Sequence, residues 1–197
     1  MNFFMAGFLL ANLQLNPAWA FGYALKLVGG LFMAGGIAEL SEFVPEARRL
    51  KSVALLFIGA CAAAAVGAFV TRDKSGLLPN IDGAVNQAAT VLLALLFFWR
   101  LLRIFADNPE VFENEPLTGK VTKKFLFFAA AMGTVIAADI VNRIAEGTVA
   151  ADAAGAVLAV IKIAGYILLA DCGLGFNKLR IQFERTQERK AKVTDRH

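Results

Sequence analysis

Residues 151–179 read ADAAGAVLAVIKIAGYILLADCGLGFNKL, an apolar run long enough to cross a lipid bilayer as a helix. Lys162 lies near the middle of this run, at a depth where a charged side chain costs about 3 kcal/mol or more. Basic residues follow the run toward the C-terminus, and such residues mark the cytoplasmic side of a membrane span. The stretch therefore predicts a membrane helix that keeps one charge inside the bilayer.

The composition extends this conclusion to the whole chain. Hydrophobic residues make up 58% of the 197 residues, and the mean hydropathy is +0.60. A soluble domain with this balance would expose more apolar surface than water tolerates. The net charge of +4 does not indicate nucleic acid, because the basic residues stand beside apolar runs, where anionic lipid head groups attract them. We expect the partners to be the lipid bilayer and, at its cytoplasmic face, anionic lipids.

The apolar runs predict an all-α, polytopic membrane protein built as a bundle of five helices. Each run approaches or exceeds the ~20 residues that a membrane helix needs. The runs are continuous and lack the alternation of a β-barrel. We expect a transmembrane domain over residues 18–176 and a basic cytoplasmic tail over residues 177–197, which could continue the last helix. The spans are predicted over residues 18–40, 53–70, 84–105, 125–144 and 151–174.

Residues 1–17 hold a shorter apolar run that stops at Asn16-Pro17. About 13 apolar residues are too few to span a bilayer. The segment also lacks the positive n-region of a signal peptide, although residues 18–20 read as a cleavage site. We expect an N-terminal interfacial helix, with Trp19 in the aromatic belt. Cleavage and a re-entrant course are the alternatives.

The distribution of Lys and Arg predicts the orientation of the bundle. Fifteen of the twenty lie beside the first and third connections or in the tail, whereas three lie on the opposite side and two lie inside spans. Cytoplasmic connections carry the excess of positive residues. We therefore expect a multi-pass protein of the plasma (inner) membrane, with the N-terminus outside and the C-terminus in the cytoplasm.

The chain offers few residues for catalysis or for binding a metal. His197 is the only histidine, so neither a histidine-based metal site nor an activated serine can form. Cys61 and Cys172 both lie in apolar runs, which favours free, buried thiols over a disulfide. We expect no enzyme activity, no cofactor and no metal.

Small residues recur on single faces of three predicted helices. Such stripes let helix backbones approach closely in a membrane. We expect them to pack within the monomer, with a homo-oligomer interface as the alternative. The bulky third span is expected to face lipid. The stripes are Gly22, Gly29 and Gly36; Gly59, Ala63 and Gly67; and Gly133 and Ala137.

Five polar residues fall in the outer half of the predicted bilayer and form the candidate site: Lys26, Asn86, Asp139, Asn142 and Lys162. Intramembrane ionisable residues are functional candidates by default. One interpretation is a cavity, open to the outside, that binds an anion, a small polar solute or a proton. In the other, Asp139 pairs with a lysine and holds the bundle together, while Lys26 reaches the outer head groups. Asp139 and Lys162 are within reach because a short connection makes their helices antiparallel neighbours.

Two functions follow from these patterns. The leading hypothesis is a small membrane protein that moves an ion or a small polar solute through an outward-facing polar cavity. The alternative is a non-enzymatic accessory or scaffold subunit of a membrane complex. Such a subunit would engage its partners through the long cytoplasmic connection, residues 106–124, and through the tail.

Overall fold

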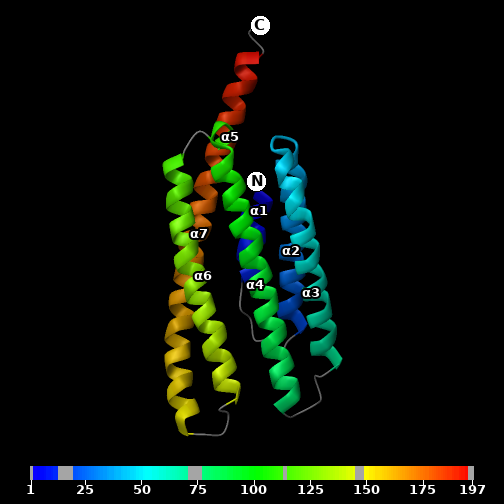
Figure 1. The fold of residues 1–197 in the computed structure, drawn as a ribbon, viewed down its shortest axis with the longest axis vertical. Coiled ribbons are helices and arrows are strands. Elements are labelled where there is room, and N and C mark those ends of the chain that lie inside the picture. Colours follow the sequence, from blue (N-terminus) through cyan, green and yellow to red (C-terminus); the bar gives the residue numbers. More distant parts are fainter. Residues whose placement is uncertain (1, 13–19, 71–76, 113–114, 145–148, 195–197) are drawn as a thin grey trace.

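The computed structural model describes residues 2–12, 20–70, 77–112, 115–144 and 149–194, and all of the regular structure in these ranges is helical. Five helices are long and apolar enough to cross a membrane, so the five predicted spans are confirmed. The protein is an α-helical, multi-pass membrane protein (Figure 1). The long helices are α2 (Ala20–Ser41), α3 (Leu50–Val70), α4 (Leu77–Asp107), α6 (Glu115–Ile144) and α7 (Val149–Thr194). The short ones are α1 (Asn2–Asn12), the 3-10 helix η1 (Pro45–Arg49) and α5 (Pro109–Phe112).

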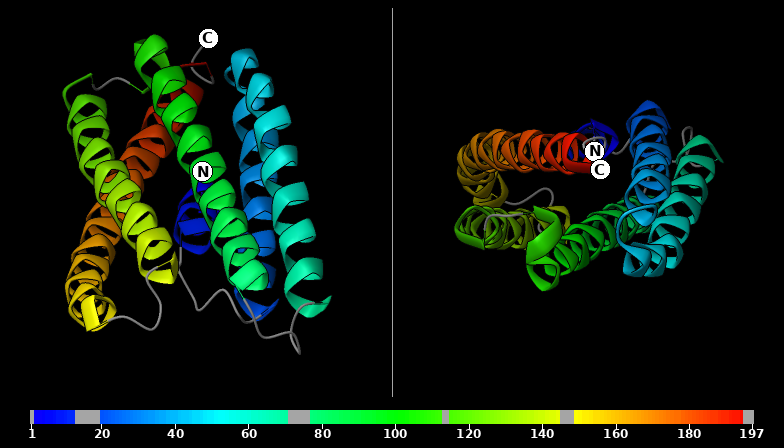
Figure 2. Two further views of the ribbon diagram at one scale, coloured as in Figure 1. Left: turned by 60° about the horizontal axis from the view of Figure 1, so that its bottom comes forward. Right: turned by 90° about the horizontal axis from the view of Figure 1, so that it is seen from above.

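The long helices form two antiparallel pairs that α4 connects. The first pair is α2 with α3 and the second is α6 with α7, while α4 packs against both α3 and α6 (Figures 1 and 2). Short connections make sequential helices antiparallel neighbours in such bundles. The outer surface exposes large apolar side chains such as Phe69, Phe127 and Val160, which suits contact with lipid.

One end of the bundle carries most of the positive charge, and we call it the basic end. There α2, α4 and α7 end while α3 and α6 begin (Figure 1). The expectation that the tail continues the last span is confirmed, because α7 runs without a break to Thr194. The start of this extension is packed rather than free. Phe183 is buried and lies edge-on to Phe43, with 5.2 Å between the ring centroids.

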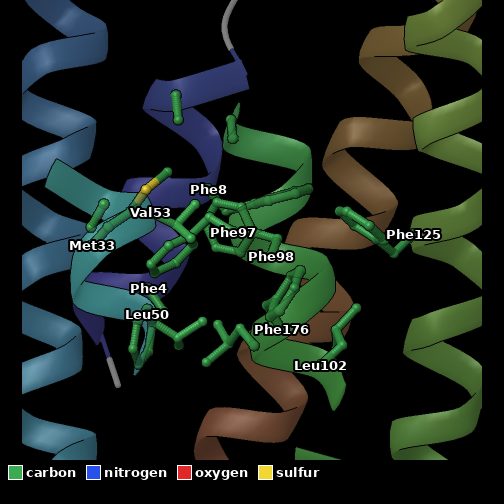
Figure 3. Packing of buried hydrophobic residues seen from close by; sticks show 14 of the residues in the cluster. Phe4, Phe8, Met33, Leu50, Val53, Phe97, Phe98, Leu102, Phe125 and Phe176 are labelled. Atoms are coloured by element: carbon green, nitrogen blue, oxygen red, sulfur yellow. The ribbon is translucent and has the colours of Figure 1, made fainter. Parts of the chain in front are cut away.

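Helix α1 packs between α2 and α7 as part of the bundle, which corrects the expectation of an interfacial segment over residues 2–12. Residues 13–17 and Trp19, which belong to the same expectation, lie outside the described residues. Helix α1 packs against α2, α4 and α7 (Figure 2). Phe8 is completely buried, and its ring lies 4.9 to 6.5 Å from those of Phe98, Phe125, Phe128 and Phe176 (Figure 3). An interfacial helix needs one polar face to present to water, whereas α1 reads NFFMAGFLLAN and is apolar on all sides between its terminal asparagines.

The direction of α1 also changes the expected placement of the N-terminus. Phe4 lies against Gly36 and Ala11 lies against Gly29, so α1 runs antiparallel to the second half of α2. The first described residues therefore lie toward the basic end, as does the end of α7 (Figure 1). This differs from the expectation that the two termini lie on opposite sides. The reason is that α1 runs through about half of the thickness of the bilayer before the chain reaches α2, since its 11 residues extend about 16 Å.

The glycine stripe of α2 packs within the monomer, as expected, but its partner is α1 rather than another span. A methyl group added at Gly29 would lie 2.9 Å from the backbone nitrogen of Ala11. The same expectation is wrong for Gly59 and Gly133. Both are exposed, and no heavy atom lies within 4 Å of an added methyl group at either position.

Helix α4 is central, so the expectation that the third span faces lipid is also wrong. Its bulky residues fill the space between the two helix pairs and contact α1 (Figure 3). Phe97 and Phe98 are completely buried, and they pack against Phe4 and Phe8 of α1 respectively. Bulky apolar residues can face either lipid or the interior of a bundle. In this protein the bulky residues of α4 face the interior, because α1 lies there and packs against them.

Candidate functional site

The predicted polar residues separate into two centres on either side of α1. The first, which we call the Lys26 centre, comprises Tyr23, Lys26, Gln87 and Thr90 on α2 and α4. The second, which we call the ion-pair centre, comprises Asn12, Asp139 and Lys162 on α1, α6 and α7. The two lysines have different partners: Lys26 bonds to Thr90 on α4, whereas Lys162 pairs with Asp139 on α6.

Lys26 points into the bundle and does not reach toward head groups. Only 4% of the residue is exposed, and its Nζ donates a hydrogen bond to Thr90 Oγ1 at 3.1 Å. The Tyr23 ring lies beneath the ammonium, 5.7 Å from centroid to Nζ, a distance that allows a cation–π interaction. Among the residues that the structure describes, no carboxylate forms an ion pair with Lys26. The contacts of the ammonium within this part of the chain are a hydroxyl and an aromatic ring.

Thr90 and Gln87 complete the centre on the α4 side. The Thr90 hydroxyl donates to the Gln87 backbone carbonyl at 2.9 Å, which leaves its oxygen free to accept from Lys26. Gln87 is 6% exposed, and its side-chain Oε1 has no hydrogen-bond partner among the described residues. An unpaired buried acceptor costs about 1–3 kcal/mol. The centre thus combines an ammonium with spare donors and an amide with a spare acceptor.

Asn86 and Cys61 border the same centre. Asn86 lies four residues before Thr90 on α4, so the two share a helix face. Its Nδ2 is 3.9 Å from the position of an added methyl group on Gly67, which places it against α3. Cys61 of α3 is completely buried and lies close to Lys26. Three helices therefore contribute to the surroundings of the Lys26 ammonium.

The ion-pair centre contains the salt bridge that the sequence predicted. Lys162 Nζ lies 3.5 Å from Asp139 Oδ1, and this contact joins α7 to α6. The Asp139 side chain is 15% exposed and that of Lys162 is 36% exposed. Asn142 lies one turn farther along α6, but its side chain is outside the described residues. A second ion pair, between Lys124 and Asp171, joins the same two helices closer to the basic end.

Asn12 at the end of α1 extends the ion-pair centre toward the core. It is 1% exposed, its Nδ2 donates to the Phe8 carbonyl at 2.9 Å, and its Oδ1 has no partner in the described part of the chain. Asn12 and Lys162 line one small cavity of about 10 Å³, together with Phe128, Met132, Val135, Gly165, Tyr166 and Leu169. Such a space holds about one water molecule and no larger solute.

Both centres lie about one helical turn beyond the end of α1, away from the basic end. Ala11 lies beside Gly29, and Lys26 precedes Gly29 by three residues on α2. On the other side, Asn12 shares its cavity with Val135, and Asp139 follows Val135 by four residues on α6. Short helices that end inside a membrane protein often adjoin its polar sites. Helix α1 therefore fills the half of the bundle nearer the basic end, and the polar residues begin where it stops.

Four residues of these centres were not among the predicted site residues: Asn12, Tyr23, Gln87 and Thr90. The sequence feature that could have identified them is a polar residue within an apolar run. This feature is not specific, because several such residues lie at helix ends and have no special role. Only the packing of distant helices distinguishes the buried ones. The two cysteines are buried and free, as the sequence indicated. Among the described residues, no cluster of His, Cys, Asp and Glu could hold a metal ion.

Comparison of the chain with protein-family models, with curated proteins and with solved structures gives no match. The functional argument therefore rests on the geometry of the two centres.

Proposed function

We propose that the protein binds a small anion or an anionic polar solute at the Lys26 centre and moves it across the membrane. The observation that carries this proposal is the burial of the Lys26 ammonium without a carboxylate partner in the described part of the chain. Removing an unpaired charge from water costs several kcal/mol. A bound anion would lower this cost, and Gln87 Oε1 would accept a hydrogen bond from a solute that also carries a donor.

The position of α1 supports access from the side opposite the basic end. The aromatic contacts of Phe8 close the bundle on the side of α1 nearer the basic end. Lys26, Asn86 and Gln87 lie beyond that closure. A solute would therefore reach the centre from the far side, and its release toward the basic end would require α1 to move. We infer the orientation from the charge distribution: the basic end faces the cytoplasm and the protein lies in the plasma (inner) membrane.

The test replaces Lys26 by methionine in the purified full-length protein. We expect Lys26→Met to abolish binding of chloride and acetate, used as probes, and their flux into proteoliposomes. We also expect a higher thermal midpoint, because the methionine variant no longer has to bury an ammonium, whose removal from water costs several kcal/mol. Thr90 keeps its bond to the Gln87 carbonyl in this variant, so no new buried donor is left unpaired.

The control is Lys123→Met, which removes an exposed lysine from α6 and the same amount of charge. It should leave probe binding, flux and thermal midpoint unchanged. A folded Lys26→Met protein that binds and moves both probes like the wild type would show that Lys26 has no role in solute binding. A large loss of stability in Lys26→Met would assign the residue to structure instead.

A second candidate is an accessory subunit that packs against another membrane protein. The observation in its favour is the exposed small-residue face of α6, which includes Ala130, Gly133 and Ala137. Such faces suit close helix packing. Gly133→Leu should then eliminate the partner band in cross-linked native membranes, whereas Phe127→Leu on the same helix should not. A wild-type protein that cross-links to nothing in its native membrane would rule this candidate out.

A further inference from the structure

A cleft at the basic end lies outside both polar centres. It opens between the first turn of α6 and the extension of α7, and its volume is about 350 Å³. This volume falls within the range of small-molecule sites. The residues that line it are Leu117 of α6 and Lys178, Ile181, Gln182, Arg185, Thr186 and Arg189 of α7.

The charges of the cleft share one face of α7. Lys178, Arg185 and Arg189 are spaced by seven and four residues, which places them in one row along a helix. Among the described residues, no carboxylate lines the cleft. Glu184 is turned away from this row and pairs with Arg180, at 3.7 Å between Nε and Oε1. Guanidinium and ammonium groups beside neutral hydrogen-bonding groups are the usual set for binding a phosphate.

The same face of α7 changes from apolar to basic along its length. Val160, Ile167 and Leu174 recur every seven residues and are 67%, 66% and 62% exposed. Lys178 follows one turn after Leu174 and begins the basic row. The order of an exposed apolar strip and then a cationic cleft matches a phospholipid, in which acyl chains adjoin a phosphate. A soluble phosphate compound has no acyl chains that could contact the apolar strip.

We propose that this cleft binds the head-group phosphate of an anionic phospholipid, whose acyl chains lie along Val160, Ile167 and Leu174. Basic pockets between membrane helices at the cytoplasmic side bind anionic head groups in this way. The site is distinct from the Lys26 centre and does not depend on the transport proposed above. It would hold α6 and the extension of α7 together through a shared lipid.

The test measures lipid binding to the full-length protein in detergent by native mass spectrometry, with phosphatidylglycerol and phosphatidylcholine as probes. We expect the wild type to prefer phosphatidylglycerol. Lys178→Gln/Arg185→Gln should weaken its binding by about 25-fold, because each of the two basic residues near a membrane surface contributes about a fivefold factor. The control, Arg48→Gln/Arg49→Gln, removes two exposed charges from the same end of the bundle and should change binding by less than about twofold, because η1 does not line the cleft.

Three results would overturn the proposal. Equal losses in the two double variants would show general attraction between charged surfaces instead of a site. Equal binding of the two lipids by the wild type would remove the role of the anionic head group. Displacement of the lipid by glycerol 3-phosphate at matched concentration would assign the cleft to a soluble ligand. If the double variant fails to fold, Arg185→Ala replaces it, and Arg185→Lys, which keeps the charge, should retain most of the binding.

Discussion

At the scale of single residues, the two intramembrane lysines have similar sequence surroundings and different partners. Leu25-Lys26-Leu27-Val28-Gly29 resembles Ile161-Lys162-Ile163-Ala164-Gly165. Lys162 nevertheless forms an ion pair with Asp139, whereas Lys26 bonds to the Thr90 hydroxyl. The difference in partner comes from the neighbouring helix, because the residues next to each lysine in the sequence are similar. A paired lysine is suited to holding two helices together, and an unpaired one to binding an anion.

The ion pair of Lys162 and Asp139 should behave as a structural contact in a double-mutant cycle. We expect Lys162→Ala and Asp139→Ala each to destabilise the protein by an amount between the ~1 kcal/mol of exposed pairs and the ~3–5 kcal/mol of buried ones. The double variant should lose less than the sum of the two, because each single variant already loses the contact between the two side chains. Thermal unfolding in detergent measures all four proteins. Strictly additive losses would mean that the 3.5 Å contact contributes nothing to stability.

At the scale of helices, α1 determines how the first half of the bundle packs. Its small residues meet the glycines of α2, and its aromatic residues meet α4, α6 and α7. The backbones approach closely at Gly7 and Gly29, because a methyl group added at Gly7 would lie 3.0 Å from the Gly29 carbonyl oxygen. Two backbones this close leave no room for a side chain on either helix.

Gly29→Ala and Gly133→Ala should therefore have opposite effects on stability. At Gly29 the added methyl meets backbone atoms of α1, and overpacking of this kind costs about 1–3 kcal/mol. At Gly133 the methyl enters open space, so the higher helix propensity of alanine should add up to about 1 kcal/mol in the monomer. Thermal midpoints of the two variants in detergent provide the comparison. A stabilising Gly29→Ala would contradict the packing of α1 against α2.

At the scale of the whole molecule, α1 links the two helix pairs and places the start of the chain inside the bundle. Phe8 contacts Phe98 on α4, Phe128 on α6 and Phe176 on α7, so one side chain joins three of the long helices (Figure 3). An N-terminal segment with this role would be lost if the first 20 residues were removed as a signal peptide.

Reporters placed at the two ends of the bundle test the proposed orientation. We expect a C-terminal fusion to green fluorescent protein to fluoresce, because this reporter matures in the cytoplasm and the basic end should face that side. Alkaline phosphatase inserted at residues 71–76, between α3 and α4, should be active on the opposite side. Activity of a phosphatase fused at the C-terminus would reverse the orientation. In a separate measurement, the mass of the purified protein would show whether residues 1–20 are retained.

The sequence by itself determined the five spans, their order and the end at which the positive charge gathers. These are local properties, because a helix in lipid satisfies its backbone within one segment and must be apolar over about 20 residues. The Asp139–Lys162 pair was also predictable, since a short connection joins α6 and α7 and few partners were available. The bulky residues of α4 and the glycines of α3 and α6 gave wrong expectations, because size alone does not tell which neighbour a helix face meets.

The tertiary structure alone decided the position of α1, the burial of Lys26 and the division of the polar residues into two centres. Each of these depends on contacts between segments far apart in the chain: Phe8 with Phe176, Gly29 with Ala11, and Lys26 with Thr90. The hydrophobic effect does not drive helices together inside a membrane, so shape and hydrogen bonding select the neighbours. Helix packing places the Asp139 carboxylate beside Lys162, the charged residue of the last membrane span. Among the described residues, it places no carboxylate beside Lys26.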